Sequence, residues 1–527
     1  MANQLFAKKP LNLLLEEMAG EHRLRRVLGP VQLTSLGVGA IIGTGIFVLT
    51  GVAAHDRTGP ALILSFVVSG IACIFAALCY AEFASMVPVA GSAYTYAYAT
   101  MGELFAWIIG WDLVLEYAVA SSTVAHGWSH YFQDFIGIFG LKIPHALTNA
   151  PFDYDPKTGV LAMTGTTLDF PAVVIAAIVT IVLVKGIRES ASFNAVMVCI
   201  KLAIVLFVIG VGSFYVNPAN WHPFAPYGLT GISFFGKTLS GQTGAGGEPL
   251  GMLAGAAIIF FAYIGFDSIS THAEEARKPK RDVPIGIIAS LIICTILYIA
   301  VSAVLTGMVP YNQIDINAPV SSAFGKVGLP WAQFLISLGA IAGITSVLLV
   351  MMLSQPRVLL AMARDGLVPP SFFGAIHERY RTPWKSTILT GVFVGVIAAF
   401  VPLRILAELV NIGTLLAFVI VCGAVLIMRK TNPDAERPFR VPFAPVTPIL
   451  GIAFCLLLMF SLPPENWMRL FIWLAVGLLI YFCYGKKHSA MAKYLAKEIA
   501  KHGVSPAGSL ATDINSEAKD TDETVSK

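Results

Sequence analysis

The stretch GVGAIIGTGIF, residues 37–47, lies in the first long apolar segment of the chain and holds four glycines. Glycine destabilises a helix by about 1 kcal/mol relative to alanine. The pattern therefore predicts a helix that is interrupted at Gly43-Thr44-Gly45. A later apolar stretch, IIFFAYIGFDSIS at 258–270, holds Gly265 and then Asp267 among apolar residues, which predicts a second, matching interruption.

The composition around these stretches indicates that lipid is the solvent. Only 13% of the 527 residues are charged, whereas soluble domains average about 25%. The apolar residues lie in long runs rather than at amphipathic spacing. We therefore expect one all-α polytopic membrane domain rather than several soluble domains.

Twelve apolar segments are long enough to cross about 30 Å of hydrocarbon. They place one membrane domain at 31–484. An amphipathic segment at 1–30 on the cytoplasmic membrane surface is expected before it, and a disordered tail at 485–527 after it. The segments are 31–55, 60–86, 101–131, 171–187, 193–215, 250–271, 284–308, 330–354, 384–402, 405–428, 446–462 and 467–484.

Lysine and arginine are distributed asymmetrically between the two sides of these segments. If the N-terminus is inside, 27 of the 35 fall on inner segments, 7 fall on outer loops, and Lys201 lies mid-helix. Inner loops of membrane proteins carry this positive excess. The count predicts that both termini are cytoplasmic.

The spacing of the two interruptions predicts an internal repeat. Five segments separate the start of the first helix from the start of the sixth, so a second five-helix unit would insert upside down, as in many secondary transporters. We expect a first repeat at 31–215, an inverted repeat at 250–428, and two further helices at 446–484.

The glycines of the first interruption allow two interpretations. The spacing Gly39-x-x-x-Gly43 would suit close contact between two helices. An unwound segment at mid-membrane would instead present free N–H groups to a carboxylate and free carbonyls to an ammonium. An amino acid carries both groups, and the paired interruption near Gly265 favours this second interpretation.

Three other patterns are interpreted as not functional. Residues 231–238 satisfy a phosphate-loop pattern, but no strand–helix context is expected there, because a phosphate loop must open a helix. His126 and His130 have a zinc-compatible spacing, but no third ligand is expected nearby, and an interfacial pair beside Trp128 and Tyr131 is favoured. The seven cysteines lie in apolar runs and indicate neither disulfides nor a metal site.

Charged residues inside apolar segments are candidates for function, because each costs about 2.5–3.5 kcal/mol at the bilayer centre. Lys201 is either half of a structural ion pair or a fixed cation that replaces a bound sodium ion. Glu82 and Asp112 lie nearer helix ends, where solvated or gating roles are equally compatible. Glu116 and Asp267 complete the set.

Several strings together resemble one family. The chain resembles the amino acid–polyamine–organocation (APC) superfamily and, within it, bacterial members of the cationic amino acid transporter family. The strings are GAIIGTGIFVLTG (39–51), CYAEFASMVPVAGSAYTYAY (79–98), KGIRESASFNA (185–195), FFAYIGFDSISTHAEEARKPKRDVPIGI (260–287) and QPRVLLAMARDGLVPP (355–370).

The resemblance implies a LeuT-like 5+5 inverted repeat with 12 transmembrane helices. It assigns the substrate carboxylate to the helix 1 break and the α-amino group to carbonyls of helices 1 and 6. It also assigns proton coupling or gating to three residues, and implies that QPRVLLAMARDGL is a cytoplasmic loop. The substrate residues are Ile41, Ile42, Gly43, Thr44, Gly45, Phe261, Ala262 and Ile264; the coupling residues are Lys201, Glu116 and Asp267.

We therefore expect a proton-coupled symporter of L-amino acids in a bacterial plasma membrane, working by alternating access. Helix 3, helix 6 and helix 8 around Gly343-Ile344-Thr345 should form the pocket walls, where only Glu116 could pair with a cationic substrate. Exchange, uniport and a non-transporting sensor remain alternatives. The expected partners are an amino acid, protons, lipid and a small membrane protein; no enzyme activity, cofactor, metal or nucleic acid is expected.

Overall fold

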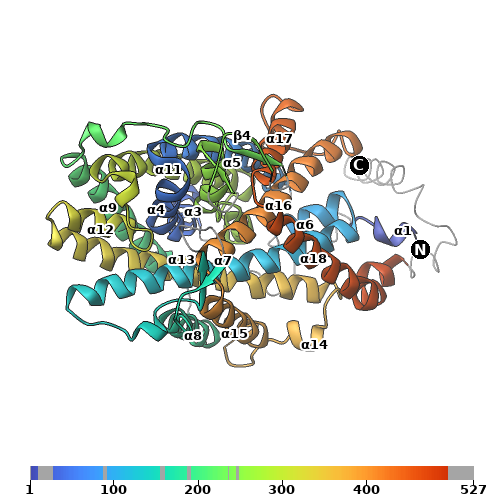
Figure 1. The fold of residues 1–527 in the computed structure, drawn as a ribbon. Helices are drawn as coiled ribbons and strands as arrows, with labels where there is room; N and C mark the ends of the chain where they lie inside the picture. The colour runs from blue at the N-terminus through green and yellow to red at the C-terminus, as the bar shows by residue number, and fades with distance from the viewer. Residues whose placement is uncertain are drawn as a thin grey trace.

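The structure is a computed structural model that describes residues 2–9, 28–86, 92–154, 161–186, 191–234, 237–244, 248–380 and 382–495. These residues form one bundle of long helices (Figure 1). Most of the predicted surface segment at 1–30 and of the tail at 485–527 lies outside the described residues.

Each of the twelve predicted segments contains helix. Eight helical stretches among the described residues are long and apolar enough to cross a membrane, and four apolar helices of 10–17 residues accompany them. The helices that matter for this bundle are α3 (Pro30–Ile41), α4 (Thr50–Ala53), α5 (Leu62–Met86), α7 (Glu103–Ile138), α8 (Phe170–Lys185), α9 (Ala191–Ser213), α10 (Met252–Ile259), α11 (Pro279–Met308), α13 (Pro330–Arg364), α15 (Trp384–Phe400), α16 (Leu403–Thr431), α17 (Val446–Phe460) and α18 (Pro464–Ile480).

Some predicted boundaries and loops were wrong. Helix α13 continues to Arg364, so most of the string predicted as a loop, 355–364, is helix. Helix α7 extends to Ile138, seven residues beyond its predicted end. The short helices α6 (Ser92–Thr100) and α12 (Pro319–Lys326) were not predicted.

The described residues also form three two-stranded antiparallel hairpins, although an all-helical domain was expected. In one of them, Lys237 pairs with Phe234. The phosphate-loop pattern at 231–238 therefore spans two strands and does not open a helix. The pairs are β1 (Phe152–Tyr154) with β2 (Leu161–Met163), β3 (Ile232–Phe234) with β4 (Lys237–Ser240), and β5 (Gln242–Thr243) with β6 (Pro249–Leu250).

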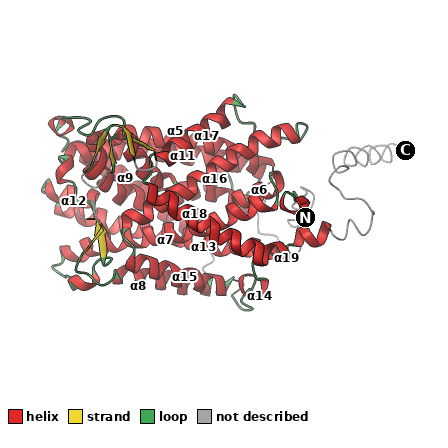
Figure 2. Cartoon of the chain, turned by 45° about the vertical axis from the view of Figure 1, so that its right-hand side comes forward, coloured by secondary structure: helices red, strands yellow, loops and turns green. Residues whose placement is uncertain are grey.

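The two ends of the bundle differ (Figure 2). One end, here named the terminal face, carries α1 (Ala2–Leu5), α6, α14 (Pro370–Phe373) and α19 (Lys486–His488). The opposite end, the hairpin face, carries the three hairpins and α12. Each long helix runs between these faces.

Helix α7 lies at the centre of the bundle. It packs along α13 and α16 and also contacts α8 and α15, while α11 packs on α3 and α5 (Figure 1). Its buried polar residues include Asp112, Glu116 and His126, all at most 2% exposed. Because polar groups in a membrane bundle turn inward, α7 is the helix most suited to carry chemistry.

The N-terminal and C-terminal segments meet at the terminal face. Lys9 pairs with Asp365 at 2.9 Å, and Tyr94 donates to the same carboxylate at 2.6 Å. The buried Glu103 carboxylate accepts from Tyr481 at 2.8 Å and from Ser489. The segments around Lys9 and Ser489 are therefore both tied to carboxylates at the terminal face.

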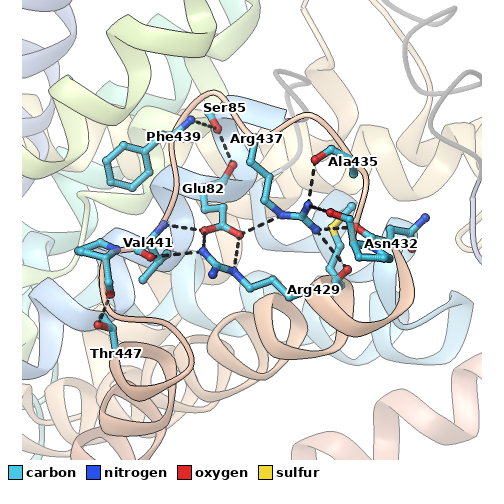
Figure 3. A network of polar contacts seen from close by, with 12 residues as sticks. Glu82, Ser85, Arg429, Asn432, Ala435, Arg437, Phe439, Val441 and Thr447 are labelled. Carbon is cyan, nitrogen blue, oxygen red and sulfur yellow. Dashed lines mark hydrogen bonds and ion pairs between the residues drawn. The ribbon is translucent and has the colours of Figure 1, made fainter.

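A carboxylate of α5 fixes the loop between α16 and α17 (Figure 3). Glu82 is 2% exposed, so the solvated role that was left open for it does not hold, and a gating role stays a prediction. Its oxygens accept hydrogen bonds from Nε and Nη2 of Arg429, at 3.1 and 2.5 Å, and from the backbone N–H of Val441 at 2.7 Å. Arg437 lies 3.5 Å from the same carboxylate. We name these four residues the Glu82 latch.

Replacing Glu82 by glutamine should lower the free energy of unfolding by about 2 kcal/mol, because charged hydrogen bonds contribute about 1.5–3 kcal/mol and two arginines lose their counter-ion. The unfolding temperature of the purified variant in detergent measures this. Glu436→Gln is the matched control, since its ion pair with Lys280 is exposed and such pairs contribute at most about 1 kcal/mol. Equal unfolding temperatures for the two variants would contradict the role of the latch.

Candidate functional site

The first helix is interrupted where the glycines are densest. Helix α3 ends at Ile41, and Ile42 is extended (φ −73°, ψ 103°). Thr44 is already helical, and a π-helical turn, η1 (Gly45–Leu49), follows. The interruption therefore lies at Ile42-Gly43, one residue earlier than Gly43-Thr44-Gly45. The first N–H groups of a helix have no acceptor within it, so η1 directs donors toward this gap.

The second interruption has the predicted position. Helix α10 ends at Ile259, and a 3₁₀ turn, η6 (Phe260–Tyr263), follows it. Ile264 is extended, and Gly265 has φ +120°. A longer 3₁₀ segment, η7 (Asp267–Glu275), then resumes the helix. Gly265 holds a backbone conformation that other residues rarely adopt.

The two interruptions are in direct contact. A Cβ on Gly45 would clash with the backbone of Ala262 in η6, and a Cβ on Gly265 would lie 2.9 Å from the carbonyl oxygen of Ala40 in α3. Each break therefore needs its own glycine so that the other backbone can approach. The helix break is therefore confirmed, whereas the binding of a carboxylate and an ammonium by its free backbone groups stays a prediction.

The carbonyl groups at the end of α3 have partners from other helices. Lys201 of α9 is fully buried and donates from Nζ to the carbonyl oxygen of Gly39 at 2.6 Å. Tyr298 of α11 donates to the carbonyl oxygen of Ile41 at 2.9 Å. A cation is favourable at a helix C-terminus, where carbonyls leave partial negative charge.

Lys201 has no carboxylate within 4.0 Å among the residues that the structure describes. Its methylenes pack on Gly343 of α13, where a Cβ would lie 3.2 Å from Cγ. The interpretation as half of a structural ion pair is therefore wrong. Lys201 instead joins α9, α13 and the end of α3.

A small cavity of about 10 Å³ lies between the two interruptions, room for about one water molecule. Its lining is apolar except for Thr44, whose Oγ1 is buried and has no hydrogen-bond partner. The walls come from α3, η1, η6, α7 and α13. The lining residues are Ala40, Ile41, Gly43, Thr44, Gly45, Ala120, Val124, Phe261, Ile264, Val347 and Met351.

The structure brings most of the predicted substrate residues together and corrects one wall. Ile42 and Ala262 adjoin the cavity in sequence but are not among its lining residues. On α13 the wall is Val347 and Met351, not Gly343-Ile344-Thr345. Helix 3 was predicted as a wall without positions, and the structure places Ala120 and Val124 of α7 in the lining.

The predicted coupling acids lie beside the cavity rather than in its lining. Asp267 accepts from the N–H of Gly265 at 3.3 Å and from Tyr117 at 3.5 Å. Glu116 lies one helical turn before Ala120, and its Oε1 has no hydrogen-bond partner. Asp112, one turn before Glu116 on α7, is 1% exposed, so the solvated role that was left open for it does not hold, and a gating role stays a prediction.

One contributor to the site was missed. Asn411 of α16 donates from Nδ2 to the carbonyl oxygens of Ala257 and Ile258, at 2.7 and 2.9 Å. These carbonyls belong to the last turn of α10, just before the second interruption. The sequence did offer a signal for Asn411, because it is an asparagine inside an apolar segment. An amide without a hydrogen-bond partner is costly in a membrane helix, so a partner on a neighbouring helix could have been expected.

The two histidines of α7 are also placed differently from the prediction. His126 is 1% exposed rather than interfacial, and its Nδ1 is hydrogen-bonded to Asp169. One ligand atom from each of His126, His130 and Asp169 lies within 4.8 Å of the other two. The statement that no third ligand is near was therefore wrong, because the fold supplies one from the start of α8.

Comparison with known proteins identifies one family and several relatives. Residues 28–482 match the amino acid permease family. The chain is 46% identical to the methylthioribose transporter of Bacillus subtilis over 491 residues, and 47% identical to the branched-chain amino acid permease BcaP of that species over 492 residues; each comparison covers 93% of this chain and all of the relative. It is 39% identical to a vacuolar cationic amino acid transporter of Arabidopsis thaliana, over 82% of this chain and 68% of that one.

The matched region includes both helix interruptions, the cavity between them and Lys201, and it leaves out only the two ends of the chain. The relatives are permeases and transporters rather than enzymes. This chain is an integral membrane protein of the amino acid permease family, in the APC superfamily.

Proposed function

We propose that the protein is a proton-coupled symporter of neutral, apolar L-amino acids that works by alternating access in a LeuT-like inverted repeat. The observation that carries the proposal is the contact between the two helix interruptions around an apolar cavity. Unwound helices of this kind supply both donors and acceptors in the middle of a membrane.

The backbone around the cavity suits the groups that all amino acids share. The N–H groups at Gly43, Thr44 and Gly45 would bind the carboxylate, because they begin the half-helix η1, where negative charge is favoured. Carbonyls of Ile41, Ile42, Phe261, Ala262 and Ile264 would accept from the ammonium. The cavity is smaller than an amino acid, so binding requires its walls to separate.

The walls favour an apolar side chain. Ala120, Val124, Val347 and Met351 face the cavity, and its lining holds no charged residue. A cationic side chain would have to be desolvated there without a counter-charge, which costs several kcal/mol. The relative named as a branched-chain amino acid permease agrees with this preference, whereas the relatives named as cationic transporters do not.

Three buried groups are proposed to couple transport to protons. Lys201 is held against the end of α3, where its charge stabilises the helix 1 break. Glu116 lies on α7, and Asp267 lies at the start of η7, just after the second interruption. The ammonium of Lys201 would supply the positive charge that a bound sodium ion supplies in a sodium-coupled carrier, and its protonation would couple transport to protons.

We propose the plasma membrane of a bacterium as the location, with the terminal face in the cytoplasm. The excess of lysine and arginine on that side supports this orientation. A small membrane protein as an additional partner stays a prediction. Exchange and uniport are the nearest alternatives, followed by a non-transporting sensor.

Uptake into proteoliposomes with an inward-acidic pH gradient should be stimulated for labelled leucine, and unlabelled valine or isoleucine should compete. Lysine and arginine should compete much less, because the cavity offers them no counter-charge. The control is the same vesicles with a collapsed gradient. Equal uptake with and without the gradient would leave uniport or exchange, and competition by lysine equal to that by valine would overturn the proposed selectivity. Binding of leucine without any uptake would indicate a sensor.

A further inference from the structure

The end of α7 near the hairpin face holds a cluster of metal-ligating side chains that lies outside the proposed transport site. His126 and His130 are one helical turn apart, with ring centroids 5.2 Å apart. Asp169 is fully buried and lies at the N-terminus of α8. One ligand atom of each residue lies within 4.8 Å of the others.

The hydrogen bonds of Asp169 fix the state of His126. Its Oδ1 accepts from Ser129 at 2.6 Å and from the N–H of Ala172 at 3.1 Å. Its Oδ2 contacts Nδ1 of His126. An ionised carboxylate only accepts, so Nδ1 carries the hydrogen, and Nε2 of the neutral His126 imidazole carries a lone pair.

Two imidazole nitrogens in this cluster have no hydrogen-bond partner. They are Nε2 of His126 and Nδ1 of His130, and both atoms are buried. An unsatisfied buried polar atom costs about 1–3 kcal/mol. Packing alone does not explain why histidines stand at these positions, because apolar residues could fill the same space without this cost.

We propose that His126 and His130 bind one zinc-like divalent ion through these two nitrogens, and that Asp169 orients His126 for that role. Imidazole nitrogens suit Zn²⁺ and neighbouring transition metals. A ligating histidine usually donates its other N–H to a carboxylate, which fixes the tautomer. Water completes the coordination.

The surroundings make the site rigid and partly accessible. The backbone N–H of Asp169 is hydrogen-bonded to Ala399 of α15, and Gln133 donates to Ser129 at 3.0 Å. His130 is only partly buried, so an ion could enter from the hairpin face. With two protein ligands, the ion would be exchangeable rather than structural.

Zinc binding can be measured on the full-length protein in detergent after dialysis against a chelator. Calorimetric titration with ZnCl₂ should give one ion per chain, and zinc but not Mg²⁺ should raise the unfolding temperature, because a ligand of the folded state stabilises it. His130→Gln should abolish binding without loss of fold, since Nδ1 of His130 makes no hydrogen bond here. Asp169→Asn, which keeps a helix-capping side chain, should weaken binding about 10- to 100-fold.

His145→Gln is the matched control, because His145 is exposed on the same face, between α7 and α8. It should bind zinc as the wild type does. Wild-type protein that binds no zinc would overturn the proposal. The same holds if His130→Gln binds zinc with unchanged stoichiometry and affinity. None of these outcomes depends on transport.

Discussion

Replacing Lys201 by methionine should abolish accumulation of substrate driven by a pH gradient, while binding of substrate persists. A gradient equivalent to 100 mV supplies about 2.3 kcal/mol per proton, enough for about 50-fold accumulation at a stoichiometry of one. In the variant, the substrate concentration inside the vesicles should rise only to the concentration outside. The measurement is the steady-state ratio of labelled leucine inside and outside proteoliposomes.

The physical reason lies at the end of α3. Lys201 donates to the carbonyl oxygen of Gly39, two residues before the helix ends. Methionine has a similar length but neither charge nor donor, so the helix terminus loses its cation and coupling loses the group that can release a proton. Stability should change little, because removing a buried charge also removes its desolvation cost.

Lys201→Arg is the matched control. It keeps a cation that stays protonated, so the helix end should remain satisfied while proton release is lost. Accumulation should therefore fail in both variants. Accumulation at the wild-type ratio in Lys201→Met would make the lysine structural, and accumulation at that ratio in Lys201→Arg would remove its proton from the mechanism.

Replacing Gly265 by alanine should reduce both stability and transport strongly. Its φ of +120° is strained for any residue with a Cβ, at about 1–3 kcal/mol. That Cβ would also lie 2.9 Å from the carbonyl oxygen of Ala40 and 3.0 Å from its carbon. The two helix interruptions would have to separate, so uptake should fall at least about tenfold, the equivalent of 1.4 kcal/mol.

Gly423→Ala provides the comparison. Gly423 lies inside α16, and a Cβ there would meet nothing within 4 Å. Alanine should be neutral or stabilise the helix by up to about 1 kcal/mol. Unfolding temperature and initial uptake rate are measured for both variants. If Gly265→Ala behaves like Gly423→Ala, the contact between the interruptions does not matter for function.

The sequence predicted the helices well because apolar runs of membrane length have few alternative structures. It failed where hydropathy carries no information. Helix α6 contains polar and aromatic residues in place of a long apolar run, and it lies at the terminal face. Gln355–Arg364 carries charge and a proline, yet it continues α13, because nothing requires a helix to end at the membrane surface.

The candidate site was predictable where a single residue type indicates a particular local structure. Glycines marked both interruptions, and the isolated Lys201 marked a buried cation. Contacts between distant segments were not predictable. The partner of Lys201 is a backbone carbonyl, which has no sequence signature, and Asp169 is 43 residues from His126. Such partners become visible only when the fold brings them together.

The bond between Gln4 and Lys486 at the terminal face has a consequence for biosynthesis. Gln4 donates to the carbonyl oxygen of Lys486 at 2.7 Å, so this bond joins two residues that are 482 positions apart in the sequence. At about 5–20 residues per second, a ribosome needs about 25–100 s to make the chain between them. During that time the Glu103 carboxylate lacks the hydrogen bonds that the Tyr481 and Ser489 hydroxyls donate to it in the folded protein. Nascent chains that stop before Tyr481 should therefore be recognised as incomplete by membrane quality control, even with most helices inserted.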